Sequence, residues 1–253
     1  MDHLLPQTGH RPIPMPRGPW IMRQCWHDLL FAHWAVDTEQ LRRLVPAELE
    51  LNLFQGRAYA GVFPFWMSGI RGRMSPPVPG MSTFPELNVR TYVSYCGIPG
   101  VYFFSLDAAS KLAVWGARRF YALPYFYADM SIQQVRDNDK KEAKFEYRSQ
   151  RIDINGNRPA EFRGRYWPIE GPRQSKPGSL AHFLTERYCL YTVQQSSVRR
   201  GYIHHLPWPL QEAEAEIEVN TMASAAGLHL PEEKPILHYS KFIEVLIWWP
   251  EQA

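Results

Sequence analysis

The chain has 253 residues, 45% of them hydrophobic and 21% charged, which is enough to bury a sizeable core and excludes global disorder. Its 28 basic and 25 acidic residues give a net charge of +3, so there is no electrostatic case for binding nucleic acid or an anionic membrane. Three widely spaced cysteines, no apolar leader and no apolar run of about 18 residues favour a soluble, cytoplasmic protein without a disulfide framework or a membrane helix.

The proline and aromatic content indicates which secondary-structure elements to expect. The 22 prolines are about 9% of the chain against an ordinary ~5%, which favours short elements joined by rigid loops over a bundle of long helices. The 9 tryptophans and an aromatic content of 14% favour strands and packed pockets. Prolines crowd residues 12–19, so we expect residues 1–24 to form an extended arm and residues 25–253 to form a single domain.

The first half of the domain is predicted to contain five strands and two helices. The first helix, over 37–44, would be capped by Asp37 or Thr38, and the second, over 108–119, would be capped by Asp107. Gln55-Gly56 indicates a turn between the second and third strands, and residues 68–82 are typical of a mobile loop. The expected strands cover 29–36, 49–54, 57–66, 84–94 and 101–106.

The second half is predicted to contain six strands, a helix over 178–191 and a short helix over 220–226. Asn155-Gly156 is a strong hairpin signal between two of the strands. The expected strands cover 130–136, 144–153, 160–167, 201–205, 212–219 and 235–249. The whole pattern predicts a mostly β (α+β) fold with a few packed helices, and about eight strands can close a barrel that holds one small ligand.

Standard cofactor and hydrolase motifs are absent from the sequence. It contains no G-x-G-x-x-G, P-loop, G-x-S-x-G or H-E-x-x-H pattern. Nicotinamide dehydrogenase, nucleotide hydrolase, α/β-hydrolase and zinc protease functions therefore lose their support. His182 and Glu186 lie four residues apart on a predicted helix and could bind a metal as a pair, but a surface or packing pair is the simpler interpretation. We expect neither a metal nor an organic cofactor.

The most informative segment is the predicted strand at 84–93. Side chains alternate along a strand, so one face carries Glu86, Asn88, Arg90 and Tyr92. The ordinary interpretation turns this face to water. The functional interpretation places it inside a barrel, where Arg90 would need either Glu86 or a bound anion as its partner, because an unpaired buried guanidinium is costly. A guanidinium suits a substrate carboxylate, and a desolvated glutamate can act as a general base.

A second candidate segment is the end of the second helix and the loop after it, residues 117–129. Arg118 is a candidate for binding substrate, although an arginine at a helix C-terminus can also serve only to stabilise the helix dipole. The Leu123-Pro-Tyr-Phe-Tyr127 run is an expected loop, and loops on a rigid scaffold often carry sites. For Tyr125 and Tyr127, a place in the aromatic core is a simpler interpretation than a catalytic role.

These segments together resemble one family, the YqjF-type family DUF2071, which is related to acetoacetate decarboxylase. The resemblance runs from about residue 26 to residue 249. It implies a mostly antiparallel, cone-shaped β-barrel that holds a small-acid cavity, with helices outside. The matching stretches are Leu30–Asp37, Phe84–Val93, Gly100–Asp107, Leu123–Phe126, Gly178–Leu180, Phe183–Tyr188, His205–Leu210 and His238–Ser240.

The resemblance also shows a departure in the chemistry. The related decarboxylases form a Schiff base through a lysine that follows a Phe-Pro dipeptide, with a second lysine beside it. Here the corresponding stretch reads Leu123-Pro124-Tyr125-Phe126, and the nearest upstream lysine, Lys111, is off the pattern. The resemblance places Glu86 where the relatives have a cavity glutamate and Tyr125 where they have the nucleophile. A tyrosine can donate a proton or stabilise an oxyanion, but it cannot form an enamine.

Three functions follow as alternatives. The first is a lyase or hydratase acting on a small carboxylic or keto acid, with Glu86 and Tyr125 as catalytic residues and Arg90, Asn88, Tyr92 and Arg118 as substrate-binding residues. The second is a non-catalytic ligand-binding or sensor barrel. The third is decarboxylation through a lysine outside the family pattern. The relatives assemble as multimers, so the resemblance also leaves open a homo-oligomer.

Overall fold

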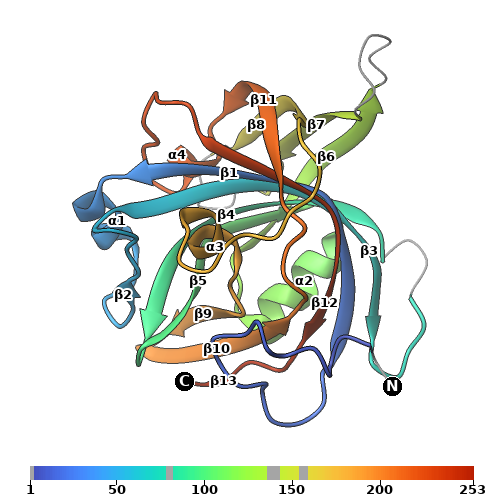
Figure 1. The fold of residues 1–253 in the computed structure, drawn as a ribbon, viewed down its shortest axis with the longest axis vertical. Coiled ribbons are helices and arrows are strands. Elements are labelled where there is room, and N and C mark those ends of the chain that lie inside the picture. Colours follow the sequence, from blue (N-terminus) through green and yellow to red (C-terminus); the bar gives the residue numbers. More distant parts are fainter. Residues whose placement is uncertain (1–2, 78–81, 136–142, 154–158) are drawn as a thin grey trace.

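The computed structural model describes residues 3–77, 82–135, 143–153 and 159–253, and these contain four helices and thirteen strands in one sheet (Figure 1). The helices are α1 (Thr38–Leu44), α2 (Lys111–Tyr121), α3 (Leu180–Thr185) and α4 (Met222–Ala225). The strands are β1 (Met22–Val36), β2 (Glu50–Leu51), β3 (Ala58–Gly72), β4 (Phe84–Tyr95), β5 (Ile98–Ala108), β6 (Tyr125–Val135), β7 (Lys144–Arg151), β8 (Glu161–Pro168), β9 (Cys189–Gln194), β10 (Ser197–His204), β11 (Gln211–Asn220), β12 (Ile236–Ile247) and β13 (Glu251–Gln252).

The sheet closes on itself because β5 and β12 each pair with more than two other strands. Strands β12, β1, β3, β4 and β5 lie side by side and are antiparallel. One set of pairings joins β5 to β12 through β9 and β10, and another joins them through β6, β7, β8 and β11. Only the pairings of β5 with β6 and with β9 are parallel among those in the described residues. The predicted antiparallel β-barrel with packed helices is confirmed.

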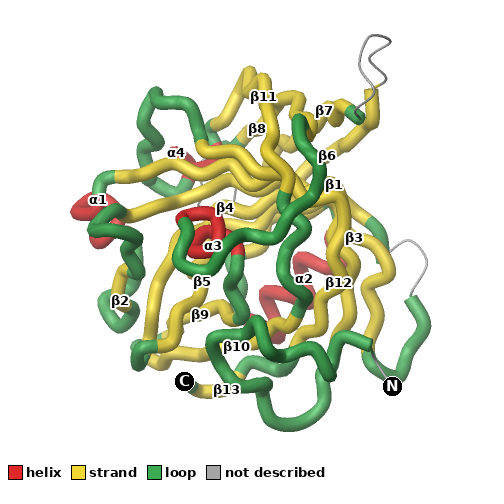
Figure 2. Tube along the Cα trace, in the orientation of Figure 1, coloured by secondary structure: helices red, strands yellow, loops and turns green. Residues whose placement is uncertain are grey.

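The five antiparallel strands β12, β1, β3, β4 and β5 pack against other parts of the protein on both faces. One face, here called the helix-covered face, carries Phe31 and Phe63 and packs against Val114 of α2. Figure 2 shows α2 and α3 within the outline of the barrel. The opposite face carries Leu87 and packs against a cluster that includes Tyr147 of β7. Burial on two sides explains why β3 reads as an almost continuous apolar run rather than as an alternation.

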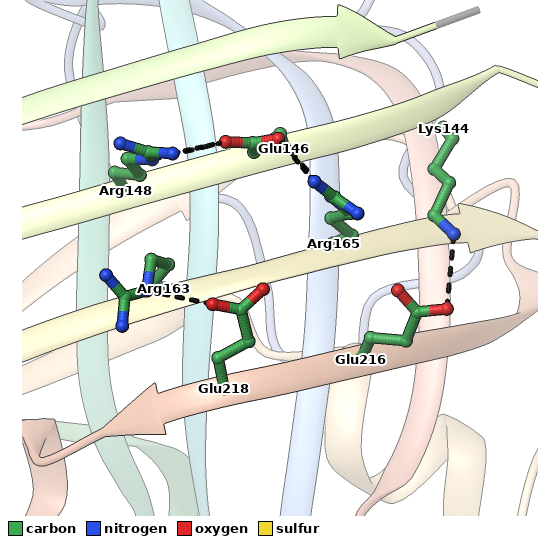
Figure 3. Close-up of polar contacts among 7 residues, drawn as sticks. All are labelled: Lys144, Glu146, Arg148, Arg163, Arg165, Glu216 and Glu218. Atoms are coloured by element: carbon green, nitrogen blue, oxygen red, sulfur yellow. Dashed lines mark hydrogen bonds and ion pairs between the residues drawn. The ribbon is translucent and has the colours of Figure 1, made fainter. Parts of the chain in front are cut away.

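The outer face of β7, β8 and β11 carries charged side chains that pair across the strands (Figure 3). Glu146 accepts from Arg148 at 2.8 Å and from Arg165 at 3.2 Å, and Lys144 contacts Glu216 at 3.2 Å. The period-two alternation at 212–219 thus marks a strand, as predicted, with its glutamates turned to solvent. Exposed pairs of this kind contribute little to the stability of the fold.

The N-terminal segment packs on the barrel. Residues 3–21 form no helix or strand, yet Leu4 and Trp20 are buried in a cluster with Leu246 and Trp248. Arg11 Nη1 donates to the Ile203 carbonyl of β10 at 2.8 Å. Strand β1 begins at Met22, within the predicted arm. None of the helices in the described ranges is long and apolar enough to cross a bilayer.

Several predicted local features are confirmed or corrected. Asp37 caps α1 by accepting from the Gln40 amide at 2.6 Å, as expected. Asp107 does not cap α2, because β5 continues to Ala108 and Ser110 is the cap instead. The predicted helix 178–191 is wrong beyond Thr185, since β9 begins at Cys189.

The predicted turns and loops are also partly confirmed and partly corrected. Phe54 and Arg57 bridge across the Gln55-Gly56 turn, but β2 pairs with β4 rather than with β3, so no long hairpin forms there. The expected loop 68–82 begins later than predicted, because β3 continues to Gly72, and residues 78–81 lie outside the described residues. The Asn155-Gly156 turn also lies outside them, although β7 and β8 pair antiparallel as the hairpin requires.

Candidate functional site

Strand β4 places the predicted polar residues on the helix-covered face. Glu86 is 3% exposed, Asn88 8% and Tyr92 1%, and Arg90 is partly buried. The ordinary interpretation, in which this face is turned to water, is therefore wrong. Polar side chains at such depth are costly unless they are hydrogen-bonded to the protein or to a ligand.

Glu86 and Tyr125 form a buried hydrogen-bonded pair. The Tyr125 hydroxyl donates to Glu86 Oε2 at 2.9 Å, and Asn88 also hydrogen-bonds to this carboxyl group. The predicted loop at 123–127 is wrong from Tyr125 onward, where β6 begins, and the parallel pairing of β6 sets Tyr125 beside Leu106 of β5. Leu106 in turn pairs with Asn88, so the sheet register itself brings the tyrosine to the glutamate.

Burial controls the protonation of this pair. It raises the pKa of Glu86 from 4.5 to about 8, although the hydrogen bonds from Tyr125 and Asn88 act in the opposite direction. Burial and the neighbouring Glu86 also hold the pKa of Tyr125 well above its ordinary value. At neutral pH the glutamate is therefore mainly protonated, and a modest rise in pH or a nearby positive charge turns it into a base.

Arg90 is not paired with Glu86, the protein partner expected for it. Its guanidinium lies 4.2 Å from the centre of the Phe63 ring and close enough to Tyr92 for its charge to act on the pKa of the Tyr92 hydroxyl. Its Nε is buried and has no hydrogen-bond partner among the described residues. Gly61 pairs with Arg90 across the sheet, and a Cβ there would lie 2.4 Å from Phe63, so glycine leaves room for the ring on which the guanidinium rests.

Tyr92 connects this region to β1 and α3. Its hydroxyl donates to the Leu184 carbonyl at 2.7 Å and lies 2.6 Å from His33 Nε2. A phenol has one proton to donate, so Nε2 of the imidazole is the donor in the second contact. The buried Nδ1 is then an acceptor, and no described residue hydrogen-bonds to it. Burial and the charge of Arg90 hold the pKa of His33 well below its ordinary value, which keeps the ring neutral.

Arg118 lies apart from the other candidates. Its Nε donates to the Tyr125 carbonyl at 2.6 Å, and its guanidinium is ion-paired with Asp153. It lines an open hollow of about 630 Å³ on the outer side of α2, together with Lys111. The structure therefore brings Glu86, Asn88, Arg90, Tyr92 and Tyr125 to one face and leaves Arg118 to contact the backbone of Tyr125 from the surface.

Other buried polar atoms on this side of the barrel lack a partner among the described residues. They belong to side chains that the sequence did not single out, and Arg187 and Trp208 are the clearest cases. Both follow α3, in the stretches 183–188 and 205–210 that carried the family resemblance. The available signal was the charged Glu186-Arg187 pair inside one of these stretches. Unsatisfied buried donors and acceptors mark places where water or a ligand binds.

Metal binding has no support in the described ranges, where no three His, Cys, Asp or Glu side chains are grouped closely enough to hold an ion. Glu186, the possible partner of His182, is bound elsewhere. It accepts from the Trp208 amide at 3.0 Å and from the Tyr188 hydroxyl.

The closed, mostly antiparallel barrel with this strand order is the acetoacetate decarboxylase-like fold. The chain belongs to the family DUF2071, described as an uncharacterized conserved protein, which matches residues 23–244. It is 50% identical over 236 residues to the uncharacterized protein YqjF of Bacillus subtilis strain 168, and the match covers 93% of this chain and 94% of YqjF. The family predicted from the sequence is confirmed.

Two solved structures show the likeness of fold. Acetoacetate decarboxylase from Legionella pneumophila has a TM-score of 0.64 at 11% identity, covering 100% of this chain and 96% of its own. The enduracididine biosynthesis enzyme MppR, in complex with pyruvate, has a TM-score of 0.62 at 12% identity, covering 100% and 97%. At this level of identity the shared feature is the barrel itself.

Proposed function

We propose that the protein is an enzyme of lyase or hydratase type that acts on a small keto acid by proton transfer through Glu86. The observation that carries the proposal is the buried Glu86 carboxyl group, 2.9 Å from the Tyr125 hydroxyl, on the same face as Arg90. Arg90 has no carboxylate partner among the described residues and is suited to bind the acid group of the substrate. Asn88 contacts Glu86 and would orient the substrate beside it.

The reaction begins at the carbon next to the keto group. Ionised Glu86 takes a proton from this carbon, and the electron pair of the broken C–H bond moves toward the carbonyl oxygen to give an enolate. Once Glu86 has taken this proton, the Tyr125 hydroxyl no longer needs to donate to it and turns its own proton to the enolate oxygen, while Arg90 holds the carboxylate. Addition or elimination next to a carbonyl passes through such an enolate, and a carboxyl group with a pKa of about 8 can both accept and return the proton near neutral pH.

A route through an imine has no support from the described lysines. The Lys111 amino group lies 4.9 Å from the centre of the Tyr127 ring, and Lys144 is bound to Glu216 on the outer face of the sheet. The other described lysines, Lys176, Lys234 and Lys241, are exposed. Treatment with acetoacetate and borohydride is therefore expected to leave the mass of the protein unchanged. A covalent adduct would favour the third alternative, decarboxylation through a lysine.

The direct test is exchange of substrate protons with deuterium. Pyruvate is a suitable first probe because MppR, with the same fold, is described in complex with it, and 2-oxoglutarate extends the test to a larger keto acid. In D₂O the protein should accelerate loss of the C3 proton signals of one or both acids in NMR spectra. Glu86→Gln should abolish this acceleration, whereas Glu232→Gln, at an exposed glutamate, should leave it unchanged.

The same experiment separates the enzyme from a ligand-binding barrel. Binding of either acid that is lost in Arg90→Met, with no exchange in the wild type, would show a binding protein and contradict the catalytic role of Glu86. If neither acid binds at millimolar concentration, the keto-acid proposal itself is wrong.

A further inference from the structure

Arg187 is a second buried guanidinium close to the proposed site, and it has no role in the function proposed above. It follows α3 and is 6% exposed. Its Nε donates to the Phe183 carbonyl at 2.8 Å and its Nη1 to Asn52 Oδ1 at 2.9 Å, both neutral acceptors. Its Nη2 is buried without a hydrogen-bond partner among the described residues.

The two arginines meet at Tyr92. The guanidinium of Arg187 lies 5.0 Å from the centre of the Tyr92 ring, and Arg90 lies close enough to the same side chain for its charge to act on the pKa of the Tyr92 hydroxyl. Burial lowers the pKa of Arg187 to about 10, and the positive charge of Arg90 adds to the lowering, as expected for two cations held near each other. Burial raises the pKa of the Tyr92 hydroxyl, so this side chain is neutral and does not balance the two positive charges.

No carboxylate in the described ranges forms an ion pair with either arginine. Glu186, next to Arg187 in the chain, is bound to the Trp208 amide and the Tyr188 hydroxyl. Glu86 is bound to Tyr125 and is mainly protonated at neutral pH. The partly buried guanidinium of Arg90 and the buried guanidinium of Arg187 therefore have no carboxylate counter-charge in the described ranges, and one monocarboxylate would balance only one of them.

We infer that the natural ligand is a dicarboxylic acid, with one carboxylate on Arg90 and the second on Arg187. The inference rests on the proposed keto-acid function and narrows its substrate class. The free Nε of Arg90 and the free Nη2 of Arg187 supply the charge-assisted hydrogen bonds to the two acid groups. Trp208 packs in the cluster of the helix-covered face, and its buried indole N–H has no partner in the described residues. It is therefore a further hydrogen-bond donor for a ligand at this face.

A matched pair of probes tests the inference on the intact protein. The acids 2-oxoglutarate and 2-oxopentanoate have the same five-carbon chain and the same 2-oxo acid end, and differ only in the terminal carboxylate. Isothermal titration calorimetry should give at least about tenfold tighter binding for 2-oxoglutarate, the effect of one charge-assisted hydrogen bond. Equal or weaker binding of 2-oxoglutarate would overturn the inference while leaving the keto-acid function in place.

Variants test whether the side chain of Arg187 causes the preference for 2-oxoglutarate over 2-oxopentanoate. Arg187→Met should remove the preference for 2-oxoglutarate and leave the affinity for 2-oxopentanoate within about twofold, and Arg187→Lys should restore part of the preference. Arg90→Met should weaken both acids alike. An Arg187→Met variant that keeps the full preference would contradict the assignment, and the wild-type comparison decides the inference even if this variant fails to fold. Failure of both acids to bind the wild type would overturn the proposed function and this inference with it.

Discussion

Replacing Glu86 with glutamine should change how the stability of the protein depends on pH. The folded protein holds the pKa of Glu86 at about 8, against an ordinary value of 4.5, because the carboxyl group is buried. Between these values the unfolded chain releases the proton and the folded protein keeps it, so the wild type loses stability as the pH rises. From pH 5 to pH 8 this single group should cost the folded state roughly 3 to 4 kcal/mol, at about 1.4 kcal/mol per pH unit.

Urea unfolding of the wild type and Glu86→Gln at pH 5, 6.5 and 8 measures this cost. From pH 5 to pH 8, the unfolding free energy of the wild type should fall by roughly 3 to 4 kcal/mol relative to that of Glu86→Gln. A glutamine also alters the hydrogen bond with Tyr125, but that effect is the same at each pH, so only the slope matters. Glu232→Gln should follow the wild type. Parallel curves for Glu86→Gln and the wild type would refute the assignment of a raised pKa to Glu86.

Two other substitutions test neighbouring parts of the structure. Tyr125→Phe removes a hydrogen bond that lowers the pKa of Glu86, so the pH at which deuterium exchange begins to rise should move upward; an unchanged profile would mean that the hydroxyl does not act on the carboxyl group. Arg151→Met leaves Asp107 buried without the guanidinium that it contacts at 2.6 and 2.8 Å, and should cost about 3–5 kcal/mol in urea unfolding. Adding Asp107→Leu should recover most of that loss, whereas Arg148→Met, on the exposed face of the same strand, should cost under about 1 kcal/mol.

The sequence predicted the polar face of β4 because alternation along a strand is a local property. Glu86, Asn88 and Tyr92 project together whatever the strand packs against. Whether that face is buried depends on which elements cover it, and the family resemblance, rather than the alternation, favoured the interior. The contact of Tyr125 with Glu86 depends on the register of a parallel pairing between β5 and β6, which no local pattern specifies.

Asp107 shows why one prediction failed. An aspartate just before an apolar helical run is a typical N-cap, and the sequence offered no reason to prefer another role. The competing partner is Arg151, which lies 44 positions further along the chain and reaches Asp107 through the pairing of β6 with β7. Arg187 was missed for a related reason: its importance comes from having no acidic partner in the fold, and the acid next to it in the sequence is bound elsewhere.

The proton on Glu86 and the charge of the ligand should be coupled. With Glu86 protonated, the positive charges of Arg90 and Arg187 are not opposed by a protein carboxylate at the site, and an anion that binds them places negative charge near Glu86. That charge raises the pKa of Glu86 further, so binding at pH 8 should take up as much as roughly half a proton, while binding at pH 5.5, where Glu86 is already protonated, should take up none. Calorimetric titration of 2-oxoglutarate in two buffers of different ionisation enthalpy measures the uptake directly. Glu86→Gln should abolish it, and an uptake that persists in this variant would assign the proton to another group.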